Sequence, residues 1–126
     1  GKIIVTGSRD CTSIVWQIDR GSKSGKKKSS QTLFRVLHIL CGHTDSVTCV
    51  AVSYDLDTVI SGSNDKTIIQ YNLNTGKFVR SIKFSGRISQ VCLCSEGMFA
   101  VYCHDVREIS LYSLNGDLLK RCCAIL

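Results

Sequence analysis

The sequence contains no proline and only one methionine and one tryptophan among its 126 residues. Proline cannot donate to a strand ladder, so its absence is compatible with closely packed strands without identifying a fold. No hydrophobic run approaches the roughly 18 residues that a membrane-spanning helix needs, and the opening segment lacks a signal-peptide pattern. These absences predict a soluble protein of the cytoplasm.

Acidic residues are missing between Arg20 and Gln31, a segment that supplies most of the formal net charge of +6. A Lys/Ser/Gly segment of this kind buries too little apolar area to offset the entropy of ordering, so we expect a solvated loop over residues 20–32. The alternative is that the loop contacts nucleic acid, an acidic lipid surface or an import receptor. The charged residues of this basic loop are Arg20, Lys23, Lys26, Lys27 and Lys28.

Cysteine, by contrast, is abundant, with eight residues. In a short secreted chain this number would indicate a disulfide scaffold. Here, however, Cys49, Cys92, Cys94 and Cys103 lie within apolar, strand-like runs, where reduced cysteine behaves as a small hydrophobic residue. We therefore expect reduced thiols that pack in the core.

Short runs rich in Val, Ile, Thr and aromatic residues recur along the whole chain, and no segment indicates a helix. Residues 74–76 and 115–117 supply Asn, Gly and Asp, which tolerate positive φ, between runs with hairpin spacing. The pattern predicts an all-β protein with strands in series. The expected strands are residues 2–7, 12–18, 33–40, 47–53, 58–63, 67–73, 78–84, 88–94, 98–103, 108–114 and 118–123.

One short motif recurs along this strand series. The segment 61–67, SGSNDKT, is followed by Tyr71, and the segment 6–12, TGSRDCT, is followed at the same spacing by Trp16. A third and looser copy is Cys103-His104-Asp105, which leads to Tyr112 one residue late. The distance along the sequence from the second copy to the third is shorter than that from the first copy to the second. The two distances differ by about the length of the basic loop. The loop is therefore interpreted as an insertion between two strands of one repeat.

The series Gly42-His43, Ser61-Gly62-Ser63, Asp65 and Tyr71 resembles a WD40 repeat, with Tyr71-Asn72 in place of Trp-Asp. The resemblance implies a β-propeller built from four-stranded antiparallel blades. It also implies a hydrogen-bonded tetrad, whose last link should differ because tyrosine offers a hydroxyl instead of an indole N–H. The implied tetrad residues are His43, Ser61, Asp65 and Tyr71, with Thr6, Asp10 and Trp16 in the first repeat.

The third repeat departs from the family pattern. Val101 stands at the Ser/Thr position, and no Gly-His pair precedes the inner strand of this repeat. We therefore expect this repeat to be held by packing and not by a tetrad. The runs Val47–Val52 and Val91–Cys94 are nearly continuous in apolar residues, which predicts inner strands sandwiched between neighbouring sheets.

The repeats predict a partial propeller of about two and a half to three blades, with parts at residues 1–40, 41–85 and 86–126. The chain is expected to begin halfway through one blade, and the remaining blades of the ring are expected from a longer chain or from other chains. The ending from Val101-Tyr102 through residues 109–119, together with residues 5–12, is similar to the C-terminal propeller of neurobeachin-like BEACH-domain proteins. Those proteins are large scaffolds in vesicle and membrane traffic.

Catalytic and metal sites are not favoured by the sequence. Cys103, His104 and Asp105 are adjacent, but neighbours on a strand point to opposite faces, and nothing supplies an oxyanion hole. Structural zinc sites have ligands at a paired spacing. That spacing is not followed by the remaining candidates, which are Cys92, Cys94, Cys103, His104, Cys122 and Cys123. We therefore expect no enzyme activity, no cofactor, no metal and no small-molecule substrate.

The expected function is a non-catalytic scaffold for protein–protein interaction. In a WD40 propeller the usual docking face is one rim of the ring, and the basic loop would project from the opposite rim. The alternative is a nucleic-acid- or acidic-lipid-binding module that uses the basic loop, with weak peripheral contact to anionic membranes. The rim residues implied by the resemblance are Arg9, Thr44, Asp45, Ser46, Asn64 and His104.

Overall fold

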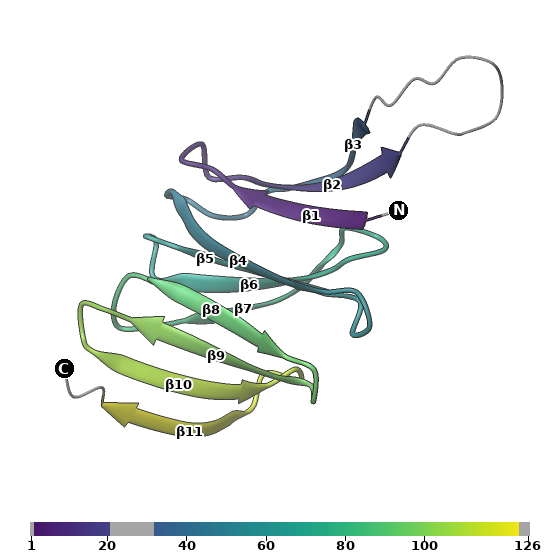
Figure 1. Ribbon diagram of the computed structural model, residues 1–126. Coiled ribbons are helices and arrows are strands. Elements are labelled where there is room, and N and C mark those ends of the chain that lie inside the picture. Colours follow the sequence, from purple (N-terminus) through teal and green to yellow (C-terminus); the bar gives the residue numbers. More distant parts are fainter. Residues whose placement is uncertain (1, 21–31, 124–126) are drawn as a thin grey trace, which may run out of the picture.

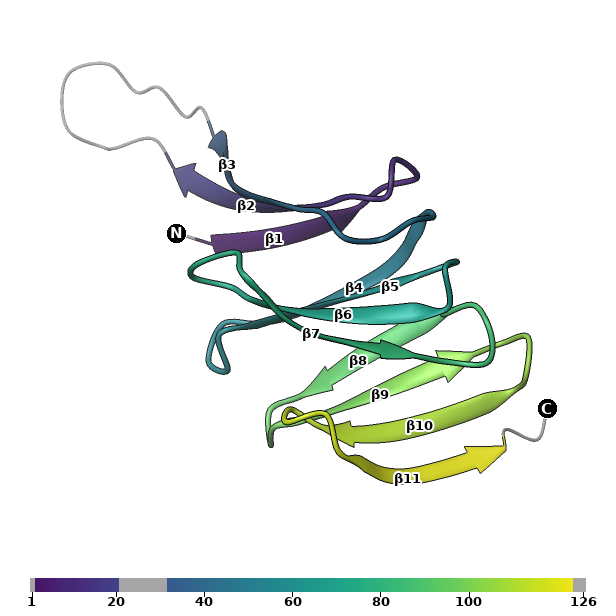
Figure 2. The ribbon, with the colours of Figure 1, turned by 180° about the vertical axis from the view of Figure 1, so that it is seen from behind.

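The computed structural model describes residues 2–20 and 32–123, and the regular secondary structure in these ranges is entirely β-strand (Figure 1). The strands form three antiparallel sheets, which are stacked on one another in the order of the chain (Figures 1 and 2). The predicted all-β architecture is confirmed. The described ranges hold no helix with the length and hydropathy required to cross a bilayer.

The first sheet contains three strands in the order β1 (Lys2–Gly7), β2 (Ser13–Arg20) and β3 (Thr32–Leu40). Strand β1 pairs with β2 along one edge. The connection from β2 to β3, residues 21–31, lies outside the described residues. Lys23, Lys26, Lys27 and Lys28 of the basic loop therefore fall outside the description, and Arg20 is the last residue of β2.

The second and third sheets each contain four strands in a meander, as expected for hairpins in series. The glycines at two of the hairpin turns, Gly76 and Gly116, have φ of 70° and 90°, which residues with a Cβ rarely adopt. The second sheet is β4 (Val47–Ser53), β5 (Thr58–Ser63), β6 (Thr67–Asn72) and β7 (Phe78–Lys83). The third sheet is β8 (Gln90–Cys94), β9 (Met98–Cys103), β10 (Glu108–Ser113) and β11 (Leu118–Cys123).

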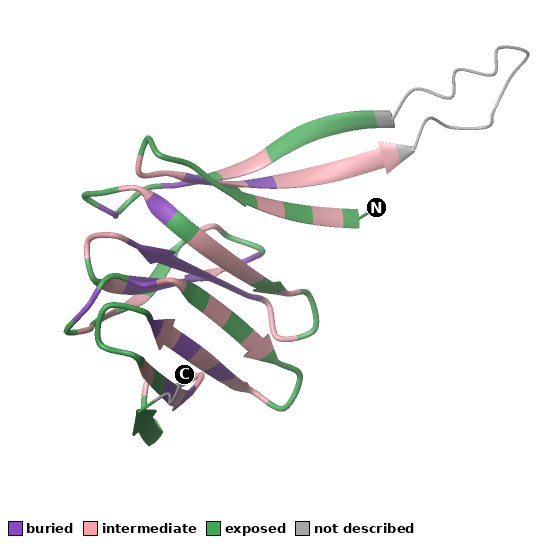
Figure 3. Ribbon diagram, turned by 60° about the vertical axis from the view of Figure 1, so that its left-hand side comes forward, coloured by how far each residue is buried: buried purple, intermediate pink, exposed green. Residues whose placement is uncertain are grey.

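The hydrophobic core lies in the two spaces between the stacked sheets. Strand β5 is buried along its whole length because it is central in the middle sheet, so alternate side chains face opposite neighbours (Figure 3). The cluster between the first and second sheets is Val15, Leu40, Val59, Ile69, Tyr71 and Leu73. The cluster between the second and third sheets is Ile60, Ile68, Ile88, Phe99, Val101, Cys103 and Tyr112.

The two apolar runs that predicted sandwiched inner strands have different surroundings. Strand β4, which contains Val47–Val52, contacts β1 of the first sheet and β8 of the third. Strand β8 packs Val91 and Leu93 against the core between the second and third sheets, while its other face is exposed because β8 belongs to the last described sheet, so the covering of that face stays a prediction. Cys92 and Cys94 are therefore exposed, although they were expected to pack in the core, whereas Cys103 is buried.

Each of the three outer strands carries a β-bulge at the same place. The register shifts where β3, β7 and β11 pass the aromatic residues Trp16, Tyr71 and Tyr112, respectively. A bulge leaves one residue out of the ladder and increases the local twist of the edge. The outer edge of the stack is therefore irregular in all three sheets.

Candidate functional site: the turn rim

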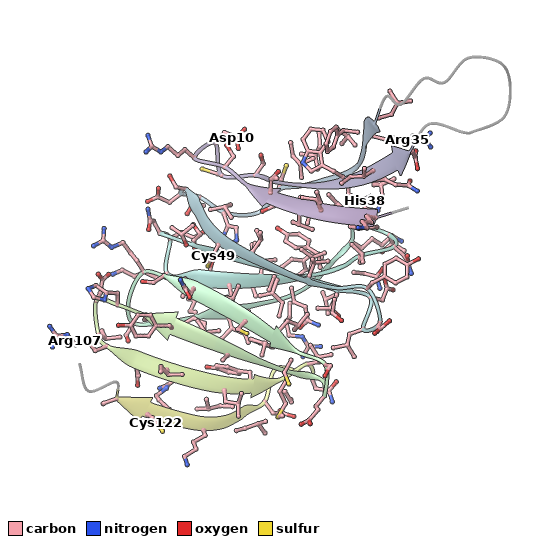
Figure 4. The ribbon with its side chains drawn as sticks, viewed as in Figure 1. Asp10, Arg35, His38, Cys49, Arg107 and Cys122 are labelled. Atoms are coloured by element: carbon pink, nitrogen blue, oxygen red, sulfur yellow. The ribbon has the colours of Figure 1, made fainter. Side chains whose placement is uncertain are left out.

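One end of the stack collects the turns that join β1 to β2, β5 to β6 and β9 to β10, together with the segments that lead into β4 and β8 (Figures 1 and 2). We call this end the turn rim. Asp10 and Arg107, from the first and third sheets, both lie there in Figure 4. The connection between β2 and β3 begins and ends at the opposite end of the stack.

A buried network fixes the turn of the second sheet. His43 Nε2 lies 2.8 Å from Ser61 Oγ, and His43 Nδ1 lies 2.9 Å from Asp65 Oδ2. Asp65 also accepts hydrogen bonds from the backbone N–H groups of Thr44 and Thr67, at 3.0 and 2.9 Å, and from the Thr67 hydroxyl. These contacts connect the segment before β4 to the β5–β6 turn.

Tyr71 takes a different place in this network from the one that the resemblance implies. Its hydroxyl donates to the backbone carbonyl of Cys41 at 3.0 Å. Burial raises the pKa of Tyr71 to about 12, so the hydroxyl stays a donor at neutral pH. Tyr71 therefore ties β6 to the connection between the first two sheets, while Ser61 is bonded to His43.

Asp65 is an ionised carboxylate in this environment. Burial acts to raise its pKa, but the hydrogen bonds from Thr67, Thr44 and His43 together hold the pKa below its ordinary value of 3.8. An ionised Asp65 accepts a hydrogen bond from the Nδ1–H group of His43, which leaves Nε2 as the acceptor for the Ser61 hydroxyl.

The first sheet contains the corresponding residues without a histidine. The indole Nε1 of Trp16 donates to Thr6 Oγ1 at 2.9 Å, which is the link that Tyr71 does not make in the second sheet. Asp10 accepts from the Thr12 hydroxyl at 2.6 Å and from the Thr12 backbone N–H at 3.0 Å, and these bonds lower its pKa. Thr6 and Asp10 are exposed within the described part of the chain.

The third sheet has a network that was not expected from the sequence. Arg87 Nε and Nη2 donate to the two carboxylate oxygens of Asp105 at 2.9 and 3.1 Å, and the Arg87 backbone N–H also bonds Asp105. These hydrogen bonds lower the pKa of Asp105 to about 2. As expected, this repeat has a packed core and no tetrad, and the exposed Arg87–Asp105 pair is an addition to the packing. The available signal was Gly86-Arg87, which precedes β8 as Gly42-His43 precedes β4.

The structure places the six predicted rim residues at the turn rim. Arg9, Thr44, Asp45 and His104 are exposed, whereas Ser46 and Asn64 are half-buried. Their backbones are fixed locally, because the Asn64 N–H donates to the Ser46 carbonyl at 3.0 Å and the His104 N–H donates to Ser89 Oγ at 3.1 Å. The turn rim thus presents solvent-accessible side chains on a backbone anchored by hydrogen bonds.

Hydrolytic chemistry does not fit these networks. Ser61, His43 and Asp65 have the connectivity of a Ser-His-Asp triad, but Ser61 is 0% exposed and the His43 side chain is 2% exposed. A substrate carbonyl cannot reach Ser61 Oγ in this arrangement. Cys103 is buried while His104 is exposed, so the Cys-His-Asp set does not assemble either.

Metal-binding geometry is also missing from residues 2–20 and 32–123, where no three His, Cys, Asp or Glu side chains are placed to hold an ion. All eight cysteines are free thiols in the structure. Burial raises the pKa of Cys49 and of Cys103, which keeps both in the unreactive thiol form.

Comparison with known proteins connects this geometry to a family. The family model described as "Neurobeachin beta propeller domain" matches residues 1–125. BEACH domain-containing protein B of Arabidopsis thaliana is 39% identical over 93% of this chain and 5% of its own length. BEACH domain-containing protein lvsE of Dictyostelium discoideum is 31% identical over 95% of this chain and 5% of its own. The chain thus spans about one twentieth of these relatives.

Solved structures agree on the architecture. The structure of U3-55K superposes with a TM-score of 0.75 at 19% identity, covering 95% of this chain and 35% of that one. The WD40 beta propeller domain of Doa1 gives a TM-score of 0.71 at 22% identity, covering 96% and 36%. The three stacked sheets are therefore blades of an unclosed WD40 propeller, as predicted.

Proposed function

Because the chain belongs to the neurobeachin beta propeller domain family, we propose that it forms consecutive blades of a non-catalytic scaffold whose turn rim binds other proteins. The observation that carries the proposal is the anchoring of three successive turns. The Asp65 network and the Arg87–Asp105 pair hold their turns to the segments that lead into β4 and β8, and Asp10 holds the first turn to Thr12. A preorganised surface of this kind binds partners at a low entropic cost.

The rim residues offered to a partner are those with exposed side chains on the anchored turns. Arg9 and His104 lie two sheets apart on the same end, with Thr44 and Asp45 between them in the stack. If no partner binds, these residues are ordinary solvated turn residues, and a direct test of the surface distinguishes the two cases.

The test compares the partner proteins that are recovered with the full-length parent protein and with its variants. A variant with Arg9→Ala, Thr44→Ala and His104→Ala changes the turn rim, and a matched variant with Tyr54→Ala, Thr75→Ala and Asn115→Ala changes the turns of the opposite rim. We expect the first variant to lose partners that the second retains, with unchanged melting temperatures. Identical partner sets for both variants and the wild type would overturn the proposal.

We further propose a role of the parent protein in vesicle or membrane traffic on the cytoplasmic side. The support is the resemblance to BEACH domain-containing proteins, of which this chain covers a small part. Fractionation of the tagged full-length chain tests this role, with recovery in cytosol and on internal membranes as the expected result. Recovery from the lumen of the secretory pathway or from the medium would contradict it.

A second candidate function uses the basic loop for nucleic acid or acidic lipid. The favouring observation is the run Lys26-Lys27-Lys28 in a segment free of acidic residues. Charge reversal of these three lysines should abolish salt-sensitive binding to RNA or to anionic vesicles if the loop is a binding element. Unchanged binding would leave the loop as a spacer.

A further inference from the structure

The outer strands of the second and third sheets each begin with a pair of exposed apolar residues. Phe78 and Val79 of β7 are 60% and 42% exposed, and Leu118 and Leu119 of β11 are 47% and 51% exposed. The second sheet has a neighbour on both faces, so the exposure of Phe78 and Val79 is not a result of an uncovered end of the stack. Leu118 and Leu119 occupy the positions opposite Tyr112 that Phe78 and Val79 occupy opposite Tyr71, so the correspondence with the second sheet places all four side chains on the circumference.

Positive charge surrounds these apolar pairs. Strands β3, β7 and β11 contain no Asp or Glu, whereas Lys77, Arg80, Lys83 and Lys120 lie on or beside β7 and β11. None of these four cations forms an ion pair within the described residues; the three lysines are exposed, whereas Arg80 is half-buried against the β10–β11 turn. Arg121 is paired with Glu108 at 3.3 Å, and Asp117 lies in the turn before β11.

The two outer strands form one continuous surface. Arg80 of β7 lies directly beside the β10–β11 turn, where a Cβ on Gly116 would be 2.8 Å from its Nη1 atom. Strands β7 and β11 also run in the same direction in Figure 2. We call this surface the basic edge; it consists of Lys77, Phe78, Val79, Arg80, Lys83, Leu118, Leu119 and Lys120.

The bulges disfavour a partner that adds a strand to this edge. The ladder shifts between Gln70 and Tyr71 opposite β7, and between Leu111 and Tyr112 opposite β11, which is where the apolar pairs lie. A bulge twists an edge and interrupts the row of backbone groups that an added strand would need. A partner that requires only apolar contact and negative charge fits the basic edge better.

We propose that the basic edge binds an anionic lipid bilayer, with Phe78, Val79, Leu118 and Leu119 entering the interfacial region. Apolar side chains flanked by lysine and arginine combine hydrophobic insertion with attraction to acidic headgroups. The turn rim remains free for protein partners in this orientation, because the basic edge lies along the circumference and the turn rim lies at one end of the strands. The surface is distinct from the basic loop, which is not among its residues.

The test is vesicle cosedimentation of the full-length chain with phosphatidylcholine alone and with added phosphatidylserine. We expect binding only to the anionic vesicles, and weaker binding at high salt. Lys77→Glu with Lys120→Glu should lower the partition coefficient by at least about fivefold for each charge, since one cation near an anionic surface contributes a factor of about five. Leu119→Ser, at a bulge position, should also lower the partition coefficient. Leu119 is replaced instead of Phe78 so that the contact between Phe78 and Tyr71 is kept.

The control variants distinguish the basic edge from the turn rim and from the basic loop. Val106→Ser removes an apolar side chain that is 39% exposed at the turn rim and should leave vesicle binding unchanged. Charge reversal of Lys26, Lys27 and Lys28 tests the basic loop separately. The proposal would be overturned if only the loop variant lost binding or if the protein did not bind anionic vesicles. Binding to an acidic peptide without binding to vesicles would also overturn it. None of these results bears on protein binding by the turn rim.

Discussion

At the scale of single residues, Asp65 is the most connected polar side chain of the second sheet. It accepts from His43, from two backbone N–H groups and from the Thr67 hydroxyl, and its side chain is only 9% exposed. Its removal would leave the buried donors without an acceptor, which is costlier than the loss of a solvent-exposed bond. The corresponding Asp10 is exposed, so the two positions form a natural comparison.

We predict that Asp65→Ala lowers the free energy of unfolding by about 1 to 3 kcal/mol, because donors remain unpaired in a buried site. Urea denaturation of the purified propeller domain that contains this chain measures the effect. Asp10→Ala should cost less, because the Asp10 carboxylate accepts from Thr12 within its own turn, whereas the Asp65 carboxylate also joins a second segment through His43 and Thr44. Equal losses at both positions would show that the buried network around His43 adds nothing.

The Arg87–Asp105 pair offers a residue-scale prediction that does not depend on unfolding. The hydrogen bonds from Arg87 hold the pKa of Asp105 at about 2, and the ordinary value is 3.8. Arg87→Ala should therefore raise the pKa of Asp105 toward 3.8, as measured by the pH dependence of its carboxyl carbon resonance. An unchanged titration would mean that the pair does not persist in solution, where its exposed side chains compete with water.

At the scale of elements, glycines at the ends of β1 and β5 allow the chain that enters the next sheet to approach closely. A Cβ on Gly62 would lie 2.5 Å from Ile88 Cγ2 and 2.7 Å from Cys49 Sγ. A Cβ on Gly7 would lie 2.6 Å from Val47 Cγ1. These two glycines belong to the repeated motif, so the motif records a packing requirement between sheets as well as a turn.

We predict that Gly62→Ala destabilises the propeller by about 1 to 3 kcal/mol through overpacking against Ile88 and Cys49. The double variant Gly62→Ala with Ile88→Ala should lose less than the sum of the two single variants, because the smaller residue 88 relieves the contact. Strict additivity in urea denaturation would contradict direct contact between these positions.

The strand series was predictable because alternation and turn residues are local signals. Strands β1, β4, β5, β9 and β11 have the expected bounds, and β8 begins at Gln90 instead of residue 88. The late start of β8 follows from Ile88, whose backbone N–H bonds Ser63 and whose side chain packs in the core. The bulges of the outer strands were not predicted, because β7 and β11 are largely exposed and carry too little apolar alternation to show where a residue is left out of the ladder.

At the scale of the whole molecule, the outward face of the first sheet is apolar. Ile4, Thr6, Trp16 and Phe34 line a shallow hollow of about 390 Å³, and Ile4 and Phe34 are 41% and 62% exposed. In the second sheet the corresponding face, which includes Tyr71, is covered by the first sheet. A face of this composition favours contact with another sheet.

We predict that the 126-residue chain alone associates in a concentration-dependent manner in reducing buffer, as measured by light scattering. Ile4→Lys with Phe34→Lys should reduce the association, because the charges disfavour burial of this face. Tyr54→Lys, at a turn residue that is 72% exposed, serves as the matched control and should have no effect. A monomer at all concentrations would show that the face is stable in water.

The repeat, the all-β class, the strand series and the residues around His43 all follow from the amino-acid sequence, because turn chemistry and alternation act over a few neighbouring residues. The partners that those residues take were decided by the packing of the sheets. Tyr71 bonds the carbonyl of Cys41, Arg87 pairs with Asp105, and Cys92 and Cys94 are exposed. These outcomes depend on how the sheets stack, which is set by contacts between residues far apart in the chain.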